Sequence, residues 1–421
     1  MLTGDAMKKI LLLVLLVFVQ SCTTDSWETL RSKTEDALGK KNYSEALEYL
    51  ENALSSDPEN AEIHYYIGQT YRMMLFADGS IINNVNMPYA SKSSDHFRKA
   101  IEISPKYTGN KFVVDPYSKI QSIWGSVAMT YLYNDNPDSA RWALKHGQEE
   151  GGFYPAIMEY NKNIMASCEK NAILFTNGDN DTYPMWFLQF IEEYRRDITV
   201  INLSLLNVPW YIKQLKNSYP FGENNLFLTL TDMDIDSLRA RNWREQKVEI
   251  PVNHDPLNKV GKIAWFIKPT IDGKAIRVQD IMLIEIFRSN NWNRPVYFST
   301  TVYEGNKIGL DHYLTLEGLV YKLNSHEEQI STEKLNSNLT KVYIYHGVND
   351  KHIDYVEEMQ NLYQNYRHSF VTLAMLYDKT GQKENVAAVL DIMDNVLPES
   401  LLPYTNEELK AEAIGLREKA L

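Results

Sequence analysis

The chain has 421 residues, a formal net charge of −12 and a hydrophobic content of 44%. This length exceeds what a single hydrophobic core usually covers, so two or three domains are expected. The hydrophobic content is that of a folded chain and excludes a mainly disordered one. The acidic balance argues against nucleic acid as a partner, because phosphate groups need a basic protein surface.

The chain opens with a short apolar leader. A methionine and two lysines at 7–9 precede an unbroken apolar run at 10–19. This run is too short to span a bilayer and fits the central part of a signal peptide. It ends in Val-Gln-Ser-Cys, which resembles the lipidation site of bacterial lipoproteins, although Gln20 departs from the usual residue there. We predict a signal peptide with a lipidated Cys22 over 1–22; an ordinary secretory leader is the alternative.

The sequence contains two cysteines, Cys22 and Cys168. If Cys22 carries lipid, Cys168 has no partner for a disulfide within the chain, and no cysteine zinc site can form. We therefore predict that Cys168 is a small buried hydrophobic residue. The lipid would attach the chain to a membrane without a membrane-spanning helix.

Helical repeats are predicted for residues 23–154. The first, at 27–60, has residues at the positions of the second helix and exit turn of a tetratricopeptide repeat (TPR): Ala46, Leu50, Ala53 and Pro58. The same offsets recur from residue 61, with an insertion around 76–90, and once more at 121–154. Three stacked helix pairs can bury one continuous core and form a concave groove, and generic helical hairpins are the alternative. A protein or peptide partner is expected in such a groove.

Within the second repeat, Gly68 is expected to let the two helices approach closely, and the second helix is expected at 93–105. Similar offsets return at 368–398. The sequence therefore predicts a second TPR-like helical region, over 351–421, near the other end of the chain.

The apolar period changes after a helical stretch at 155–170. An apolar run at 172–176 predicts a buried strand, the segment 184–196 predicts an amphipathic helix, and 198–206 predicts a second strand. A strand, a helix and a second strand in this order favour a parallel sheet. We expect an α/β domain with a parallel or mixed sheet over 155–350.

Further elements of this domain are predicted toward its end. The sequence suggests a helix at 207–216, a strand at 263–267, a helix at 280–287, and strands at 294–299 and 342–345. The overall fold class is thus an α+β multidomain protein. It has an N-terminal TPR α-solenoid, a central α/β domain and C-terminal TPR-like helices.

The loop after the first predicted strand is the candidate ligand or metal site. It contains Asn177, Asp179, Asn180, Asp181 and Thr182. Ligands collect beyond the carboxyl ends of parallel strands, and two carboxylates can hold a hard divalent cation. The Asp-Asn-Asp pattern also occurs as a metal-binding sequence in many sugar-nucleotide enzymes. A structural role is an equal alternative, in which the loop turns the chain and Asp181 or Thr182 caps the next helix.

Other polar and aromatic residues have less specific roles. Arg294 precedes a predicted strand and could bind an anion, although a surface salt bridge is the commoner role. Three tryptophans stand at the starts of elements, where core packing is favoured over sugar stacking. They are Trp186, Trp210 and Trp292.

Four segments of the chain resemble one family. They read ILFTNGDNDTYPMWFLQ, RRDITVINLSLLNVPWYIKQLK, NWNRPVYFSTTV and LEGLVYKL. They resemble the soluble C-terminal region of bacterial multi-pass proteins similar to protein O-mannosyltransferases, over about residues 155–403. The resemblance implies an envelope location and a link to glycans. The multi-pass portion that would transfer sugar is not found here, so no catalytic residues are carried over.

The sequence favours a binding protein over an enzyme. It contains no nucleophile elbow with a Ser-His-Asp arrangement, no His-Glu-x-x-His, no P-loop and no G-x-G-x-x-G. We expect a lipid-anchored envelope protein, on the outer membrane, with its soluble part in the periplasm or at the cell surface. It would act as a protein-interaction scaffold or accessory factor linked to glycan processing. The alternative is a metal-dependent enzyme, or a binder of glycans or sugar-lipids, that uses the Asp179–Asp181 loop; the sequence does not specify its cofactor.

Overall fold

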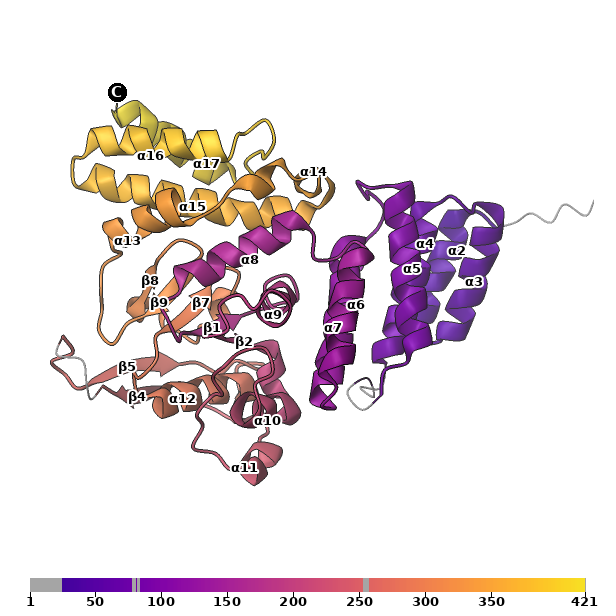
Figure 1. Ribbon diagram of the computed structural model, residues 1–421, viewed down its shortest axis with the longest axis horizontal. Helices are drawn as coiled ribbons and strands as arrows, with labels where there is room; N and C mark the ends of the chain where they lie inside the picture. Colours follow the sequence, from indigo (N-terminus) through magenta and orange to yellow (C-terminus); the bar gives the residue numbers. More distant parts are fainter. Residues whose placement is uncertain (1–24, 78–80, 82–83, 253–256, 421) are drawn as a thin grey trace, which may run out of the picture.

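The structure is a computed structural model that describes residues 25–77, 81, 84–252 and 257–420. The predicted signal peptide and Cys22 lie outside the described residues. The described chain forms an N-terminal helical arm, an α/β body and a C-terminal helical layer (Figure 1). None of the helices within these described ranges is long and apolar enough to cross a membrane.

The helical arm consists of three successive helical hairpins. Its helices are α2 (Trp27–Gly39), α3 (Tyr43–Ser56), α4 (Ala61–Phe76), α5 (Met87–Ile103), α6 (Pro116–Tyr133) and α7 (Pro137–Glu149). Each helix is preceded by a polar residue whose side chain accepts a hydrogen bond from a backbone N–H of the first turn. These caps are Ser26, Asn42, Asn60, Asn86, Asp115 and Asn136. Local capping therefore sets where the arm's helices begin.

Two helices of the arm begin earlier than the sequence predicted. α5 begins at Met87, inside the predicted insertion at 76–90, because Asn86 caps it and a proline fits its first turn. α6 begins at Pro116 for the same reason, with Asp115 as its cap. The three hairpins themselves lie where the repeats were predicted.

The predicted role of Gly68 is confirmed. A Cβ atom at this position would lie 3.0 Å from the Ser93 carbonyl oxygen and 3.1 Å from Cδ1 of Phe97. Helices α4 and α5 therefore pack too closely for a larger side chain at residue 68.

The α/β body contains a five-stranded mixed sheet with the strand order β2-β1-β7-β9-β8. These strands are β1 (Ile173–Thr176), β2 (Thr199–Asn202), β7 (Val296–Ser299), β8 (Leu314–Leu316) and β9 (Val320–Leu323). Strands β2, β1 and β7 are parallel, whereas β9 is antiparallel to both β7 and β8. The predicted parallel β-α-β unit is confirmed, and β8 and β9 were not predicted as strands.

Helices and two small ribbons complete the body. The helices are α8 (Pro155–Ser167), α9 (Tyr183–Phe190), α10 (Pro209–Asn217), α11 (Asp232–Ser237), α12 (Val278–Asn290) and α13 (Thr332–Ser337). The antiparallel ribbons pair β3 (Arg241–Asn242) with β6 (Ala275–Ile276), and β4 (Gln246–Pro251) with β5 (Lys262–Ile267). Short 3-10 and π-helical turns lie at Ser204–Asn207, Glu304–Asn306, Asp311–Tyr313, Asn338–Val342 and His346–Asn349.

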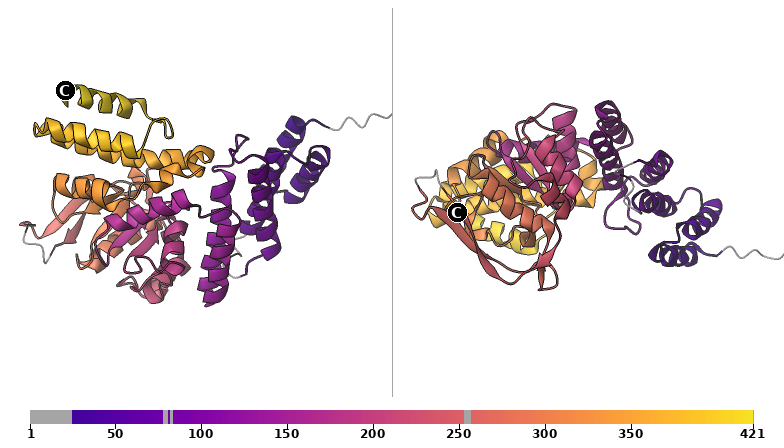
Figure 2. Two further views of the ribbon diagram at one scale, coloured as in Figure 1. Left: turned by 45° about the horizontal axis from the view of Figure 1, so that its top comes forward. Right: turned by 90° about the horizontal axis from the view of Figure 1, so that it is seen from below.

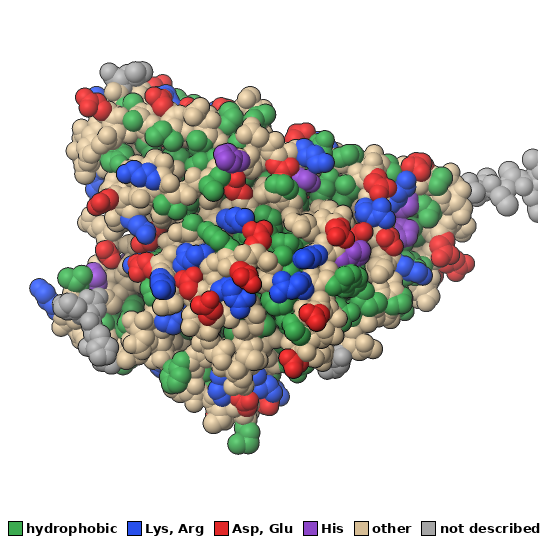
Figure 3. Space-filling model, viewed as in Figure 1, with side chains coloured by type: hydrophobic (Ala, Val, Ile, Leu, Met, Phe, Trp, Pro, Cys, Tyr) green, Lys and Arg blue, Asp and Glu red, His purple; other side chains and the backbone are tan. Residues whose placement is uncertain are grey.

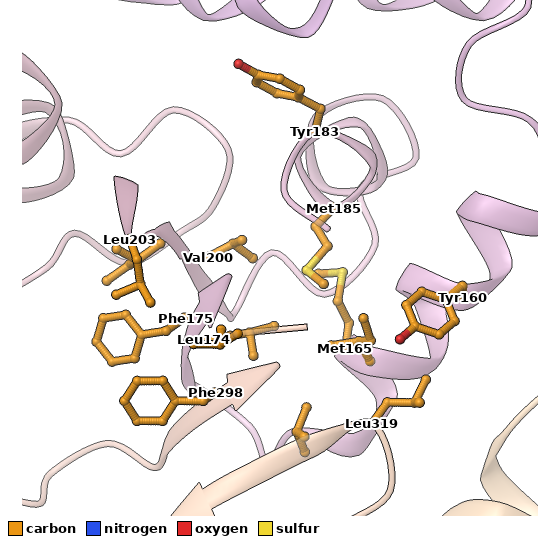
Figure 4. Close-up of a cluster of buried hydrophobic side chains, with 14 of the residues drawn as sticks. Tyr160, Met165, Leu174, Phe175, Tyr183, Met185, Val200, Leu203, Phe298 and Leu319 are labelled. Atoms are coloured by element: carbon orange, nitrogen blue, oxygen red, sulfur yellow. The ribbon is translucent and has the colours of Figure 1, made fainter. Parts of the chain in front are cut away.

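Side chains from both faces of β1 form the core of the body. The ring of Phe175 lies 5.0 Å from that of Phe298 on β7 and 6.1 Å from that of Phe287 on α12, measured between centroids. Figure 4 shows Leu174 on the other side of the strand, toward Met165 of α8. All four residues of β1 are buried, as expected for a strand covered by helices on both faces.

The helix predicted at 184–196 is wrong at its end. α9 ends at Phe190, and all eight of its residues are buried, so it is not amphipathic. Glu193 and Arg195 have φ values of 54° and 48°, which turn the chain back toward β2 instead of continuing the helix. Trp186 of α9 stacks on Phe221 at 4.4 Å between ring centroids, which confirms its predicted core role.

The strand predicted at 342–345 is also wrong. The backbone there is bound by a side chain instead of by a neighbouring strand. Asn163 of α8 donates to the Ile344 carbonyl oxygen at 2.6 Å and accepts from the Ile344 N–H at 3.1 Å. A single amide side chain thus binds both backbone groups of Ile344, which a sheet would have paired.

Arg294 binds the body in place of the expected surface salt bridge. Its guanidinium donates to the carbonyl oxygens of Asn171 and Ala172, at 2.7 and 3.0 Å, and to Oγ1 of Thr199 at 2.6 Å. It therefore ties the beginnings of β1 and β2 together. Cys168 is buried, as predicted, and burial raises the pKa of its thiol.

The C-terminal helical layer lies over α8 (Figures 1 and 2). It comprises α14 (His352–Tyr355), α15 (Glu357–Lys379), α16 (Lys383–Val396) and α17 (Glu407–Ala420). α15 and α16 form the helical pair predicted at 368–398, although α15 begins earlier. On the face seen in Figure 3, acidic and basic side chains are interspersed, so the negative net charge does not form a single acidic field there.

Candidate functional site

The predicted site loop lies at a switch point of the sheet. β1 is followed by α9 and then by β2 on one side of β1, whereas β7 lies on the other side. The connections after β1 and β7 therefore diverge at the carboxyl ends of these neighbouring parallel strands. In open α/β sheets, such a divergence leaves the crevice in which ligands bind. We call residues 177–182, which follow β1, the GDND loop.

Asp181 closes this loop from within. Only 2% of the residue is exposed, and its carboxylate accepts from the N–H groups of Asn177 and Gly178, at 2.9 and 2.8 Å. The hydroxyl of Thr301, just after β7, donates to the same carboxylate. Burial raises the pKa of Asp181, while these three donors act in the opposite direction. Asp181 thus holds the GDND loop to the loop after β7.

The predicted helix cap is not formed. Thr182 occupies the residue before α9, but its side chain accepts no hydrogen bond from the helix. Its hydroxyl instead lies 2.7 Å from Oγ1 of Thr176 and accepts from Nδ2 of Asn202 at 3.0 Å. Thr182 therefore connects the ends of β1 and β2 below the loop.

The two asparagines of the loop bind neighbouring segments. Oδ1 of Asn177 accepts from Nδ2 of Asn306 at 2.8 Å. Asn180 accepts from Nε2 of Gln121 at 3.0 Å and donates to Oγ of Ser118 at 3.2 Å. Both partners of Asn180 belong to α6, so the loop is fixed against the helical arm as well as within the body.

The contact between α6 and the body continues beyond the loop. Nε2 of Gln121 also donates to the Asp179 carbonyl oxygen at 3.2 Å, and the hydroxyls of Ser126 and Tyr183 lie 2.8 Å apart. Gly125 packs on the Tyr183 ring so closely that a Cβ atom would lie 2.4 Å from its Cγ. These contacts fix the position of the arm relative to the loop.

A cleft of about 420 Å³ lies between the GDND loop and the arm. Residues of the loop and Thr301 line it from the body, and residues of α4, α6 and the segment before α6 line it from the arm. Leu362 of α15 contributes a further apolar contact surface. We call this space the junction cleft, because all three parts of the molecule meet there. Asp179 is the loop carboxylate that lines it without a role in closing the loop.

Two cationic side chains of the arm line the junction cleft. Nη2 of Arg72, on α4, donates to Oγ of Ser122 at 3.0 Å, and its Nε is buried with no hydrogen-bond partner among the described residues. Nζ of Lys119, on α6, donates to the Phe112 carbonyl oxygen at 2.5 Å. Burial lowers the pKa of Lys119 to about 8; the charge of Arg72 adds to this effect, and Asp179 opposes it.

The rim of the cleft includes a strained residue. Val113 is 92% exposed and has a φ of 78°. A β-branched residue rarely adopts this left-handed conformation, which costs on the order of 1–3 kcal/mol. Such strain concentrates at functional sites, where the surrounding structure holds it in place.

The carboxylates of the two loop aspartates differ in their surroundings. Asp181 uses its carboxylate within the loop, and Asp179 faces the cleft. Within the described ranges, no group of three or more His, Cys, Asp or Glu side chains is placed to hold a metal ion.

The sequence identified the loop but missed several residues that line the cleft. Thr301, Arg72 and Lys119 were not predicted as site residues. Arg72 and Lys119 belong to α4 and α6, which were predicted as repeat helices, and a basic residue on such a helix is usually expected to face solvent. Their arrangement arises only when the arm folds against the body.

The fold and the cleft together define an α/β domain with a cleft at the switch point of its sheet, flanked by helical hairpins. A family model, TMEM260-associated domain 2, matches residues 157–236 and 239–341. The match covers most of the body, including the GDND loop and Thr301, and supports the family resemblance of this region. No curated protein matches the chain.

Proposed function

We propose that this chain is a cell-envelope accessory protein that binds a polar, saccharide-class ligand in the junction cleft. The observation that carries the proposal is the contrast between the two aspartates of the GDND loop. Asp181 locks the loop, and Asp179 lines an open cleft at the sheet's switch point. A rigid loop binds with a smaller loss of conformational freedom, so this arrangement favours ligand recognition.

The groups around Asp179 suit a hydroxylated ligand. The Asp179 carboxylate can accept hydrogen bonds, and the hydroxyl of Ser122, which accepts one from Arg72, can still donate its own. Val114 and Leu362 add apolar surface, against which the C–H groups of a sugar ring can pack. A mixture of a few polar groups and apolar walls is the usual composition of a small-molecule site. The glycan link implied by the family resemblance supports the same class of ligand.

A second function, protein recognition by the helical arm, is supported by a separate observation. Trp142 of α7 is half-exposed and stacks on His146 at 5.1 Å between ring centroids. Exposed aromatic residues are common anchors in protein interfaces. We propose that the hairpins are TPR-type and that the arm binds a protein or peptide. Crosslinking in intact cells tests this, and recovery of no partner through α7 would argue against it.

We retain lipidation of Cys22 as part of the proposal. A tether there would hold the arm and body at the surface of a membrane, with the ligand cleft accessible from the aqueous side. Membrane fractionation of a Cys22→Ser variant tests this point. A variant that stays in the membrane fraction would place the anchor elsewhere.

A glycan array and calorimetry, each applied to the wild-type chain and to an Asp179→Asn variant, test the ligand proposal. We expect the wild-type chain to bind, and Asp179→Asn to lower the affinity for the retained glycan by about tenfold, as expected for loss of a ligand hydrogen bond to a charged group. Its thermal midpoint should stay near that of the wild type, because Asp179 does not close the loop. Asp181→Asn is the matched control and should lower the midpoint. Absence of binding to every glycan, or unchanged affinity in Asp179→Asn, would refute the proposal.

A further inference from the structure

We infer that the ligand carries an anionic group, a phosphate or a carboxylate, and that Arg72 and Lys119 of the helical arm bind it. This inference rests on the proposed function, because it names the chemical class of the ligand in the same cleft. It assigns half of the site to the arm, which lies outside the matched domain.

Arg72 has an unused donor at the cleft. One guanidinium nitrogen binds Ser122, whereas Nε is buried without an acceptor among the residues that the structure describes. A buried N–H group without a partner is unfavourable, and one on a charged group more so. An anion with two or three oxygens provides the acceptors that the planar guanidinium binds best. The guanidinium of Arg72, which lies over the Phe76 ring and lines the cleft, therefore has hydrogen-bonding capacity left for an anionic oxygen.

Lys119 provides a second positive charge beside the first. Its ammonium group has three donors, and the structure shows one of them on the Phe112 carbonyl oxygen. Burial and the neighbouring Arg72 both disfavour its charged form. Two cations in one partly buried space repel each other, and an anion bound between them would relieve that repulsion. The charge pattern therefore favours binding of an anion by the pair.

The carboxyl groups near the cations do not satisfy them fully. Asp115 caps α6, where it accepts from the N–H and the hydroxyl of Ser118, at 3.0 and 2.7 Å. Burial and the nearby Asp115 raise the pKa of Glu358, which favours its neutral form. Of the two loop aspartates that line the cleft, Asp181 already accepts hydrogen bonds within the body, which leaves Asp179 beside the cations. An anion with hydroxyl groups fits this set, because its charge binds the cations and a hydroxyl binds Asp179.

The geometry of the junction fixes these groups relative to one another. Lys119 and Gln121 are close together on α6, and Gln121 binds the backbone of Asp179. Close packing of Gly125 on Tyr183 keeps α6 at this distance. The cation pair and Asp179 therefore form one rigid surface, although they belong to different parts of the chain. Sugar phosphates and uronic acids share the chemistry that this surface recognises.

The test is calorimetry on the full chain at pH 7 with four probes: glucose, glucose 6-phosphate, glucuronate and inorganic phosphate. We expect at least one anionic sugar to bind about tenfold or more tightly than glucose, which corresponds to about 1.4 kcal/mol. Arg72→Gln and Lys119→Gln should each lower the affinity for the anionic sugar much more than the affinity for glucose, and so remove most of this preference. Arg244→Gln and Lys145→Gln, at exposed positions, are the matched controls and should behave as the wild type.

The outcomes separate this inference from the proposed function. If glucose and both anionic sugars bind equally, the anion inference fails and the saccharide proposal stands. If inorganic phosphate binds as tightly as glucose 6-phosphate, the cations form a simple anion site and the inference fails. If the glycan array and all four probes show no binding, both proposals fail. A stronger preference for glucose 6-phosphate than for glucuronate identifies phosphate as the group, and the reverse order identifies carboxylate.

Should Arg72→Gln not fold, Arg72→Lys provides a second variant. Lysine keeps the charge but lacks the planar arrangement of donors. We expect Arg72→Lys to keep part of the preference for the anionic sugar, with an affinity between those of the wild type and Lys119→Gln. If Arg72→Lys and Lys119→Gln each keep the full wild-type affinity for the anionic sugar, the roles assigned to Arg72 and Lys119 are refuted.

Discussion

The helical arm and the C-terminal helical layer both contain helical hairpins, but they contact the body in different ways. The arm binds the GDND loop through polar groups, as Gln121 donates to Asp179 and Asn180. The C-terminal layer packs aromatic rings onto α8, with Tyr366 at the centre. The rings around it belong to Tyr160, Tyr343, Tyr345 and Tyr363.

This difference shows that a helical hairpin can either stabilise the body or help to form a cleft beside it. Aromatic packing excludes water and buries large side chains, so it stabilises the fold and leaves little room for a ligand. Hydrogen bonds between α6 and the loop fix the distance between the two parts while the cleft beside them stays open. The contact with the arm is thus suited to a binding site, and the contact with the C-terminal layer is suited to support.

The largest effect is expected at the aromatic contact. Tyr366 is fully buried, and its hydroxyl accepts from Nδ2 of Asn163 at 2.7 Å. Tyr366→Ala should lower the free energy of unfolding by about 3–5 kcal/mol, as for other large buried aromatic residues. Denaturant unfolding measures this change. Tyr303→Ala, at an exposed position, is the control and should leave stability almost unchanged. A loss below about 1 kcal/mol in Tyr366→Ala would contradict the supporting role of this contact.

A smaller effect is expected at the polar contact. Gln121→Ala removes the hydrogen bonds to Asp179 and Asn180 and should cost about 1–2 kcal/mol. The loosened loop should also exchange its amide hydrogens faster than in the wild type. Hydrogen exchange measured by mass spectrometry over the GDND loop reports this change. Gln148→Ala, on an exposed face of α7, is the control. Unchanged exchange of the loop in Gln121→Ala would show that α6 does not hold it.

The smallest effect is expected at the rim of the cleft. Val113→Gly should raise the thermal midpoint slightly, because glycine adopts a φ of 78° without strain. The gain should be about 1 kcal/mol or less, since glycine also increases the freedom of the unfolded chain. Val114→Gly is the matched control and should lower the midpoint, because Val114 has no such conformation to relieve. Equal destabilisation by both substitutions would argue against strain at Val113.

The sequence predicted the parts of the fold that local patterns determine. The recurring offsets of small and apolar residues located the hairpins, and the run at 172–176 located β1 and the GDND loop after it. The short strands β8 and β9 were missed because Thr315 and Lys322 interrupt their apolar residues, whereas β1 lies in a continuous apolar run. The segment at 342–345 was misread as a strand because its apolar pattern is that of a strand, whereas Asn163 binds its backbone.

The site was predicted only in part, for a related reason. The sequence did not distinguish the roles of the two aspartates of the GDND loop. They differ because Thr301 and the backbone of the loop donate hydrogen bonds to Asp181. Arg72 and Lys119 lie far from the loop along the chain, and nothing near them marks a binding role. Contacts made by tertiary packing have no signature in a local pattern, so the arm's share of the cleft was not foreseen.

The limits of the domain match have a consequence for other proteins that contain this domain. Residues 157–236 and 239–341 include the loop and Thr301, but neither α4 nor α6. A protein with the same domain behind a different N-terminal segment would face the loop with different side chains. Such proteins would then differ in ligand selectivity because their N-terminal segments differ, while the shared loop would stay unaltered.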